Sequence, residues 1–230
     1  MWRDNVELLN AYFLAAETVL TREGKKVNAL DISTGPCLAP LMATMSCINK
    51  VQLSDYDSSN REEIVTSDVD YWREYAKELL NLFPNRKLYV DDLLSQLDAL
   101  RKDSIPLDVD LRRSPMFLPD TVPPYSVALL TMHFVVDSIC DTAAECFELL
   151  EKSLAYVKPE GWLLMSTLID SDGWQLGDVK EPSPHLSEGQ INDFLASQGF
   201  TVVSRTRSIR KANQIYSGGW TVFLAQNATS

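Results

Sequence analysis

The stretch from Val27 to Asn60 constrains the fold of this chain more than any other. It opens with an apolar segment, VNALDI, which contains Asp31 and runs into a turn with a glycine. An apolar, helix-like run follows, and a second apolar segment ends at Asp55, 24 residues after Asp31. In a nucleoside-binding βαβ unit, the first turn lets the backbone approach the ligand, and the acid after the second strand accepts hydrogen bonds from a ribose diol. The stretch therefore predicts an α/β fold that binds a nucleoside.

The turn after the first segment narrows the kind of nucleoside. It holds a single glycine, Gly35, followed by Pro36, and so it is not the GxGxxG turn of dinucleotide-binding proteins. A compact Asp-x-Ser-Thr-Gly-Pro turn suits S-adenosylmethionine (SAM) better, because SAM has no pyrophosphate to cradle. The expected cofactor or substrate is therefore SAM.

Composition and charge limit the partners. The chain has 230 residues, 45% of them hydrophobic, and a formal net charge of −11. So acidic a chain repels phosphate backbones, which argues against nucleic acid and favours a small-molecule substrate. Its four cysteines form no CxxC pair and no zinc-like spacing, so we expect no metal, reduced thiols and a cytoplasmic location. No apolar run approaches the roughly 18 residues of a membrane span, and the oligomeric state is not predicted.

Apolar runs and helical periodicity alternate along the chain. Five strands are expected at Val27–Ile32, Val51–Leu53, Ile105–Leu111, Ser126–Met132 and Trp162–Leu168, and a closing pair at Phe200–Ile209 and Trp220–Ala225. Helices are expected at residues 4–22, 37–46, 57–65, 69–83, 91–101, 142–157 and 187–198. The order predicts a doubly wound, mostly parallel sheet with an antiparallel C-terminal pair. We expect one domain over 1–230, with 68–124 as an elaboration within it.

The combination of DISTGP, LSDYDSSN, DVDLRR and LEKSLAYVKPEGWLLM carries a family resemblance. The chain resembles the class I SAM-dependent methyltransferases, and more narrowly the group of nicotinamide, phenylethanolamine and indolethylamine N- or S-methyltransferases. The resemblance runs from about residue 27 to the end. Members carry a Tyr-rich N-terminal lid, and here only 30 residues precede Asp31, so the lid is short, altered or cut off.

The resemblance implies a set of cofactor contacts. The turn beside the methionine part of SAM would use Asp31, Ser33, Thr34 and Gly35. The ribose would contact Asp55 and Asn60, and the adenine would contact Tyr56, Asp110 and Leu111. Under the amino acid part or the sulfonium would lie Thr131 and Met132, at the end of the fourth strand.

Reaction chemistry is expected from residues after the fourth and fifth strands. His133 follows the fourth strand, where ligands bind, so it is a candidate general base as well as a structural histidine. Phe134 and Trp174 are candidates for cation–π contact with a sulfonium or ammonium, or are simply packed. Asp170 is a candidate for binding an acceptor amine or is a solvated loop acid. In the nicotinamide enzyme an acid faces the acceptor ring at the position of Thr167, so nicotinamide is not the expected substrate.

Three functions follow from these residues. The first is SAM-dependent methyl transfer to a small molecule, by resemblance an amine. The second keeps SAM but cyclises it, so that the amine of SAM attacks its own γ-carbon and gives azetidine-2-carboxylate and methylthioadenosine; the exchange at Thr167 keeps this alternative open. The third is a non-catalytic SAM-binding protein.

Overall fold

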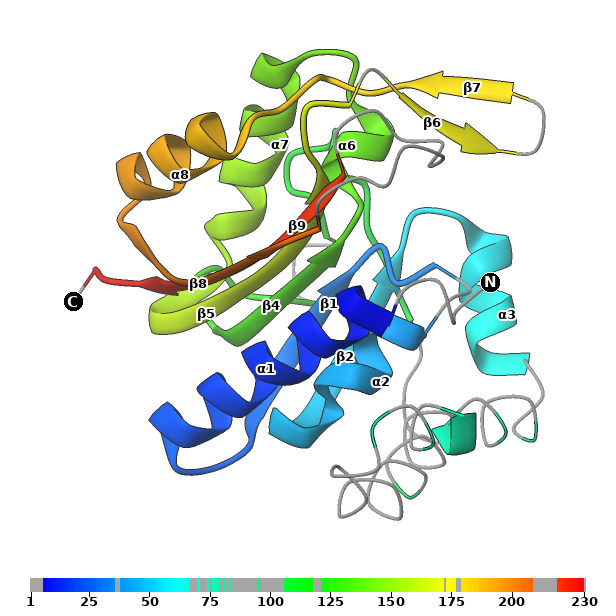
Figure 1. Ribbon diagram of the computed structural model, residues 1–230, viewed down its shortest axis with the longest axis vertical. Coiled ribbons are helices and arrows are strands. Elements are labelled where there is room, and N and C mark those ends of the chain that lie inside the picture. Colours follow the sequence, from blue (N-terminus) through cyan, green and yellow to red (C-terminus); the bar gives the residue numbers. More distant parts are fainter. Residues whose placement is uncertain are drawn as a thin grey trace. The chain divides into compact units, whose positions relative to one another are not determined.

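A computed structural model describes most of the chain in two compact units, Met1–Val109 and Asp110–Ser230 (Figure 1). The described residues are 6–35, 38–66, 106–117, 121–171, 173–176, 179–208 and 219–229, with a few single positions between 70 and 95. The helices predicted at 69–83 and 91–101 lie outside the continuously described ranges. The prediction of one domain with an elaboration at 68–124 stays a prediction.

The first unit is built on three parallel strands. Its elements are α1 (Val6–Glu23), β1 (Val27–Ile32), α2 (Ala39–Thr44), the 3-10 turn η2 (Met45–Cys47), β2 (Ile48–Asp55), α3 (Ser58–Thr66) and β3 (Leu107–Asp108). The strand order is β3-β2-β1, and both pairings are parallel. Because parallel strands end at one edge of a sheet, the turns after β1 and β2 lie side by side.

Apolar spacing explains the N-terminal helix. The buried residues of α1 recur at helical spacing and include Leu9, Tyr12, Ala16 and Val19. This face packs against α2 and η2. The first turn of α2 contains Pro40, and that position tolerates proline because its N–H has no partner within the helix.

The second unit combines a parallel strand pair with an antiparallel one. Its elements are β4 (Val127–His133), α6 (Val136–Ile139), α7 (Ala143–Leu154), β5 (Val157–Leu168), β6 (Gly173–Leu176), β7 (Val179–Pro182), α8 (Glu188–Ser197), β8 (Phe200–Arg207) and β9 (Trp220–Asn227). The order is β4-β5-β9-β8, where β4–β5 is parallel and the β5–β9 and β8–β9 pairings are antiparallel. The predicted mostly parallel α/β sheet with an antiparallel C-terminal pair is confirmed.

The segment Lys158–Gly161 lies near the start of β5, shortly after the end of helix α7. The β4–β5 register jumps here, from Val127 opposite Val157 to Leu129 opposite Trp162. A Cβ on Gly161 would lie 2.9 Å from the Lys158 carbonyl oxygen, so glycine is needed for space. The predicted helix 142–157 ends earlier than expected, at Leu154, and Ala155 is its C-cap.

Two predictions about strands were wrong. The third strand was expected to reach Leu111, but β3 ends at Asp108, because the Asp110 N–H bonds the Met116 carbonyl and turns the chain. The segment after β5 was expected to be a loop, yet β6 and β7 form a hairpin of their own (yellow in Figure 1). Its sequence lacks the apolar run that marks a buried strand.

Candidate functional site

The turn after β1 is tied to the end of β2. The Thr34 N–H donates to the Ser54 carbonyl (2.9 Å), and the Ser54 hydroxyl donates to the Asp31 carbonyl (2.7 Å). Ser33 has a φ of 55°, a left-handed conformation that is uncommon for a residue other than glycine. Gly35 has a φ of 61°, which glycine adopts without strain. These bonds hold the predicted residues 31–35 in one tight turn.

Asp55 is the centre of this first cluster. Asp55 is only 4% exposed. Its carboxylate accepts hydrogen bonds from the Gly35 N–H (2.7 Å), the Asp57 N–H (2.9 Å) and the Asn60 amide (3.1 Å). Gly35 binds Oδ2, whereas Asp57 and Asn60 bind Oδ1. The structure thus brings together Gly35, Asp55 and Asn60, which the family resemblance implied as parts of one SAM site.

Tyr56 and Arg61 lie next to the end of β2, Tyr56 directly after the strand and Arg61 in α3. The Tyr56 ring is on the surface, since the residue is 65% exposed. Arg61 Nη1 donates to the carbonyl oxygens of Asp55 (2.6 Å) and Tyr56 (2.9 Å), and it lies 3.5 Å from an Asp108 carboxylate oxygen. Sequence reasoning missed Arg61, because nothing in the pattern marks an arginine that binds backbone oxygens.

Asp110 and Leu111 open the second unit in a closed turn. The Asp110 carboxylate accepts from the Arg112 N–H (3.0 Å) and lies 3.1 Å from Arg113 Nε. Leu111 is buried. The Asp110 carboxylate therefore organises its own turn, whatever else it binds.

The end of β4 places four predicted residues in succession. Thr131 and Met132 are buried in the strand. His133 ends it, and Phe134 follows with a φ of 56° and an N–H that donates to the Ser166 carbonyl (2.9 Å). Both ring nitrogens of His133 are buried, and burial lowers its pKa to about 3. A group with so low a pKa is a weak proton acceptor near neutral pH.

Asp137 is a buried acid that sequence reasoning missed. It lies in α6 with no exposed surface, and its Oδ2 accepts from the Leu168 N–H at the end of β5 (3.2 Å). The Thr167 hydroxyl is also beside the carboxyl but donates to the Leu168 carbonyl. Within the described part of the chain, Oδ1 has no hydrogen-bond partner. Burial raises the pKa of Asp137 to about 6, against the lowering effect of the Leu168 hydrogen bond.

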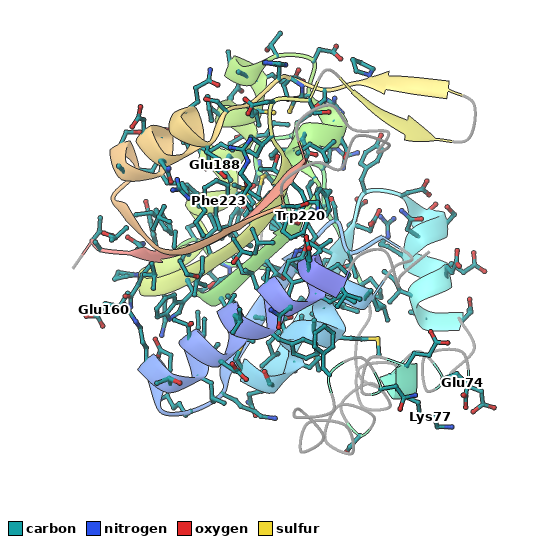
Figure 2. All side chains as sticks on the ribbon, viewed as in Figure 1. Glu74, Lys77, Glu160, Glu188, Trp220 and Phe223 are labelled. Carbon is teal, nitrogen blue, oxygen red and sulfur yellow. The ribbon has the colours of Figure 1, made fainter. Side chains whose placement is uncertain are left out.

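Asp170 is held by the loop and strand around it. It has a φ of 50°, its N–H donates to the Leu186 carbonyl (2.8 Å), and its carboxylate binds Arg207 (3.2 Å). Arg207 also lies 3.9 Å from Glu188, which Figure 2 labels at the start of α8. Asp170 is therefore paired rather than simply solvated.

Trp174 lies on β6 of the hairpin, opposite Glu181 on β7. Its side chain is outside what the structure describes, so the predicted contact with a cation stays a prediction.

Metal-binding clusters and membrane-spanning helices are both absent from the residues that the structure describes. Those residues contain no group of three or more His, Cys, Asp or Glu side chains arranged to hold a metal ion. None of the described helices is long and apolar enough to cross a membrane.

Comparison with known proteins matches almost the whole chain to one family. The sequence model of the NNMT/PNMT/TEMT family matches residues 8–226. Among curated proteins, the chain is similar to phenylethanolamine N-methyltransferase of Homo sapiens. The two are 22% identical over 192 residues, which is 81% of this chain and 67% of that protein.

Solved structures agree in fold. The (4+2)-cyclase SpnF aligns with a TM-score of 0.58 at 12% identity, over 95% of this chain and 82% of that one. A 1,6-didemethyltoxoflavin-N1-methyltransferase from Burkholderia thailandensis, solved with 1,6-didemethyltoxoflavin and S-adenosylhomocysteine, aligns with a TM-score of 0.53 at 12% identity. That alignment covers 95% of this chain and 79% of the other. At these identities the likeness concerns the fold alone.

Proposed function

Because the chain belongs to the NNMT/PNMT/TEMT family, we propose that this SAM-dependent methyltransferase acts on the nitrogen of a small-molecule amine. SAM supplies an activated methyl group together with its own leaving group. The protein has to hold the cofactor, orient the acceptor nitrogen, exclude water and accept one proton.

The hydrogen-bonding groups at the end of β2 fit a nucleoside. A carboxylate has about four acceptor positions, and Asp55 uses three of them in hydrogen bonds with described residues, two on Oδ1 and one on Oδ2. Oδ2 therefore keeps room for one ribose hydroxyl. The Asn60 amide, which now donates to Oδ1, would turn to the second hydroxyl. Tyr56, exposed beside them, would stack on the adenine.

Ser33, Thr34, Gly35 and the buried Asp31 would hold the amino acid part of SAM. In the second unit we assign Asp110 and Leu111 to the adenine edge, and Thr131 and Met132 to the sulfonium side. These four assignments rest on the family resemblance, and for Thr131 and Met132 also on their position at the end of β4.

The observation that carries an amine acceptor is the buried carboxyl of Asp137 beside Thr167. A carboxylate next to the end of β5 attracts a cationic amine. With a pKa of about 6, it takes up a proton near neutral pH more readily than His133 does with a pKa of about 3. We therefore propose Asp137 as the proton acceptor. His133 and Phe134 would shape the acceptor side, together with Thr167, Asp170 and Trp174.

One incubation distinguishes this proposal from its alternatives. The protein is mixed with SAM, with and without a panel of primary and secondary amines, and the released nucleoside is identified by mass spectrometry. S-adenosylhomocysteine that appears only with an amine supports the proposal. Methylthioadenosine from SAM alone means that the enzyme cyclises SAM instead, and tight SAM binding without turnover means a binding protein.

Two substitutions test the proposed roles. Asp55→Ala should weaken S-adenosylhomocysteine binding at least about tenfold by calorimetry, because the turn and the diol both lose their acceptor.

Asp137→Asn should lower kcat about a hundredfold with little change in cofactor affinity. Asp141→Asn is the matched control, since it is the same exchange at an exposed position four residues on. An equal kcat for Asp137→Asn and Asp141→Asn would exclude Asp137 as the base.

A further inference from the structure

Arg61 lies in the first turn of α3, where its guanidinium faces backbone rather than solvent. One nitrogen, Nη1, reaches two consecutive carbonyl oxygens at the end of β2, those of Asp55 (2.6 Å) and Tyr56 (2.9 Å). The Arg61 side chain is 21% exposed, so these are partly desolvated, charge-assisted hydrogen bonds. They fix the direction of the backbone at the two residues that carry the nucleoside contacts.

The same guanidinium joins β2 to β3. Nη1 lies 3.5 Å from Asp108 Oδ1, and Asp108 is the register partner of Asp55 in the parallel pair. The Asp55 carbonyl also accepts from the Val109 N–H (3.3 Å), so two donors converge on one oxygen. Arg61 therefore fastens the ends of both strands at the point where the chain leaves β2.

Loss of the Arg61 hydrogen bonds would affect the Tyr56 side chain more than the Asp55 side chain. Asp55 is buried and held by its own carboxylate contacts, but Tyr56 is 65% exposed and no described contact orients its ring. The direction of the Tyr56 side chain is set by its backbone, which Arg61 binds directly. Lysine retains the charge but presents a single ammonium rather than a planar group, so it replaces arginine only in part.

We infer that Arg61 is a positioning residue for the nucleoside end of the SAM site, acting through the backbone of Asp55 and Tyr56. This inference rests on the proposed function, because it assumes that these two residues bind the nucleoside. It predicts that Arg61 sets the affinity for the adenosine portion, whichever acceptor the enzyme uses.

Calorimetry with S-adenosylhomocysteine and with methylthioadenosine tests this inference without turnover. Arg61→Met should weaken the binding of both ligands by about the same factor, roughly tenfold, because both share the nucleoside. Arg61→Lys should recover part of that loss. Lys50→Met removes one positive charge from an exposed position on β2 and should leave both affinities unchanged. Thermal melting of each variant is measured in parallel.

A double-mutant cycle separates positioning from general stability. If Arg61 acts through Tyr56, the double variant Arg61→Met, Tyr56→Ala loses less affinity than the product of the two single losses. If the two single losses simply multiply in the double variant, the inference is overturned. It is also overturned if Arg61→Met lowers the melting temperature but leaves the affinity unchanged at temperatures where the variant is fully folded. If Arg61→Met does not fold, Arg61→Lys and Asp108→Asn take its place, each with an expected loss of about threefold. If the wild-type chain binds neither ligand, the proposed function fails rather than this inference.

Discussion

Replacement of Asp137 by asparagine should stabilise the protein above pH 6. The pKa of this buried carboxyl rises from 3.8 to about 6, so the folded chain holds the proton over a pH range where the unfolded chain has released it. Two pKa units at 1.36 kcal/mol each correspond to a cost of about 3 kcal/mol once both states are ionised. This cost is absent below about pH 3.8 and complete above about pH 6. Asparagine keeps an acceptor for the Leu168 N–H but carries no charge to bury.

The assay is urea unfolding of wild type and Asp137→Asn at several pH values between 4.5 and 7.5. The free energy of unfolding of the variant relative to wild type should rise by about 2 kcal/mol from pH 4.5 to pH 7.5. This is the part of the ionisation cost of Asp137 that develops between these two pH values. Asp141→Asn controls for the change in net charge. A difference that stays constant with pH would show that the Asp137 pKa is not raised, and the proposed proton acceptor would lose its physical basis. Stability gained together with activity lost is the pattern expected of a functional acid.

Three further predictions concern stability and titration. His133 should stay neutral by NMR from pH 8 down to about pH 4.5, because burial lowers its pKa to about 3; a ring titration near pH 6.5 would contradict this. Gly161→Ala should cost about 1–3 kcal/mol of unfolding free energy, because its Cβ would lie 2.9 Å from a backbone oxygen; an unchanged urea midpoint would refute the steric argument. Thr221→Val should cost about 1–2 kcal/mol, since it removes the 2.7 Å hydrogen bond to the mostly buried Glu188, whereas Thr201→Val at an exposed position should be near neutral.

The first cluster could be predicted from sequence because its parts are local. Apolar runs that end in acids gave the parallel pair, and parallel strands bring their ends together whatever the rest of the chain does. The role of Asn60 beside Asp55 was implied by the family resemblance, and the structure has the Asn60 amide bonded to the Asp55 carboxylate. Arg61 is adjacent in sequence, but its role depends on where two carbonyl oxygens point, and no pattern of side chains encodes that.

The acceptor side was less predictable because it depends on burial. Asp137 looks like an ordinary acid after an apolar strand, and its environment arises only when the short helix α6 brings it against the end of β5. The hairpin β6–β7 was missed for a related reason. Its strands form a separate two-stranded sheet, so they carry no continuous apolar run.

The position of Asp137 also changes what Thr167 implies. The absence of an acid at Thr167 was an argument against nicotinamide as substrate, and it kept open the alternative that SAM acts on itself. In the folded chain a carboxyl from α6 lies beside Thr167 and bonds the next residue of the strand, so negative charge at the end of β5 is relocated rather than lost. This relocated charge is the reason that we propose an amine as the acceptor. The self-cyclisation alternative then has no support from Thr167. If that alternative is correct, the double variant Thr167→Asp, Asp137→Asn should methylate amines no better than Asp137→Asn alone. We expect the opposite, a partial recovery of amine methylation, because the acid returns to the strand.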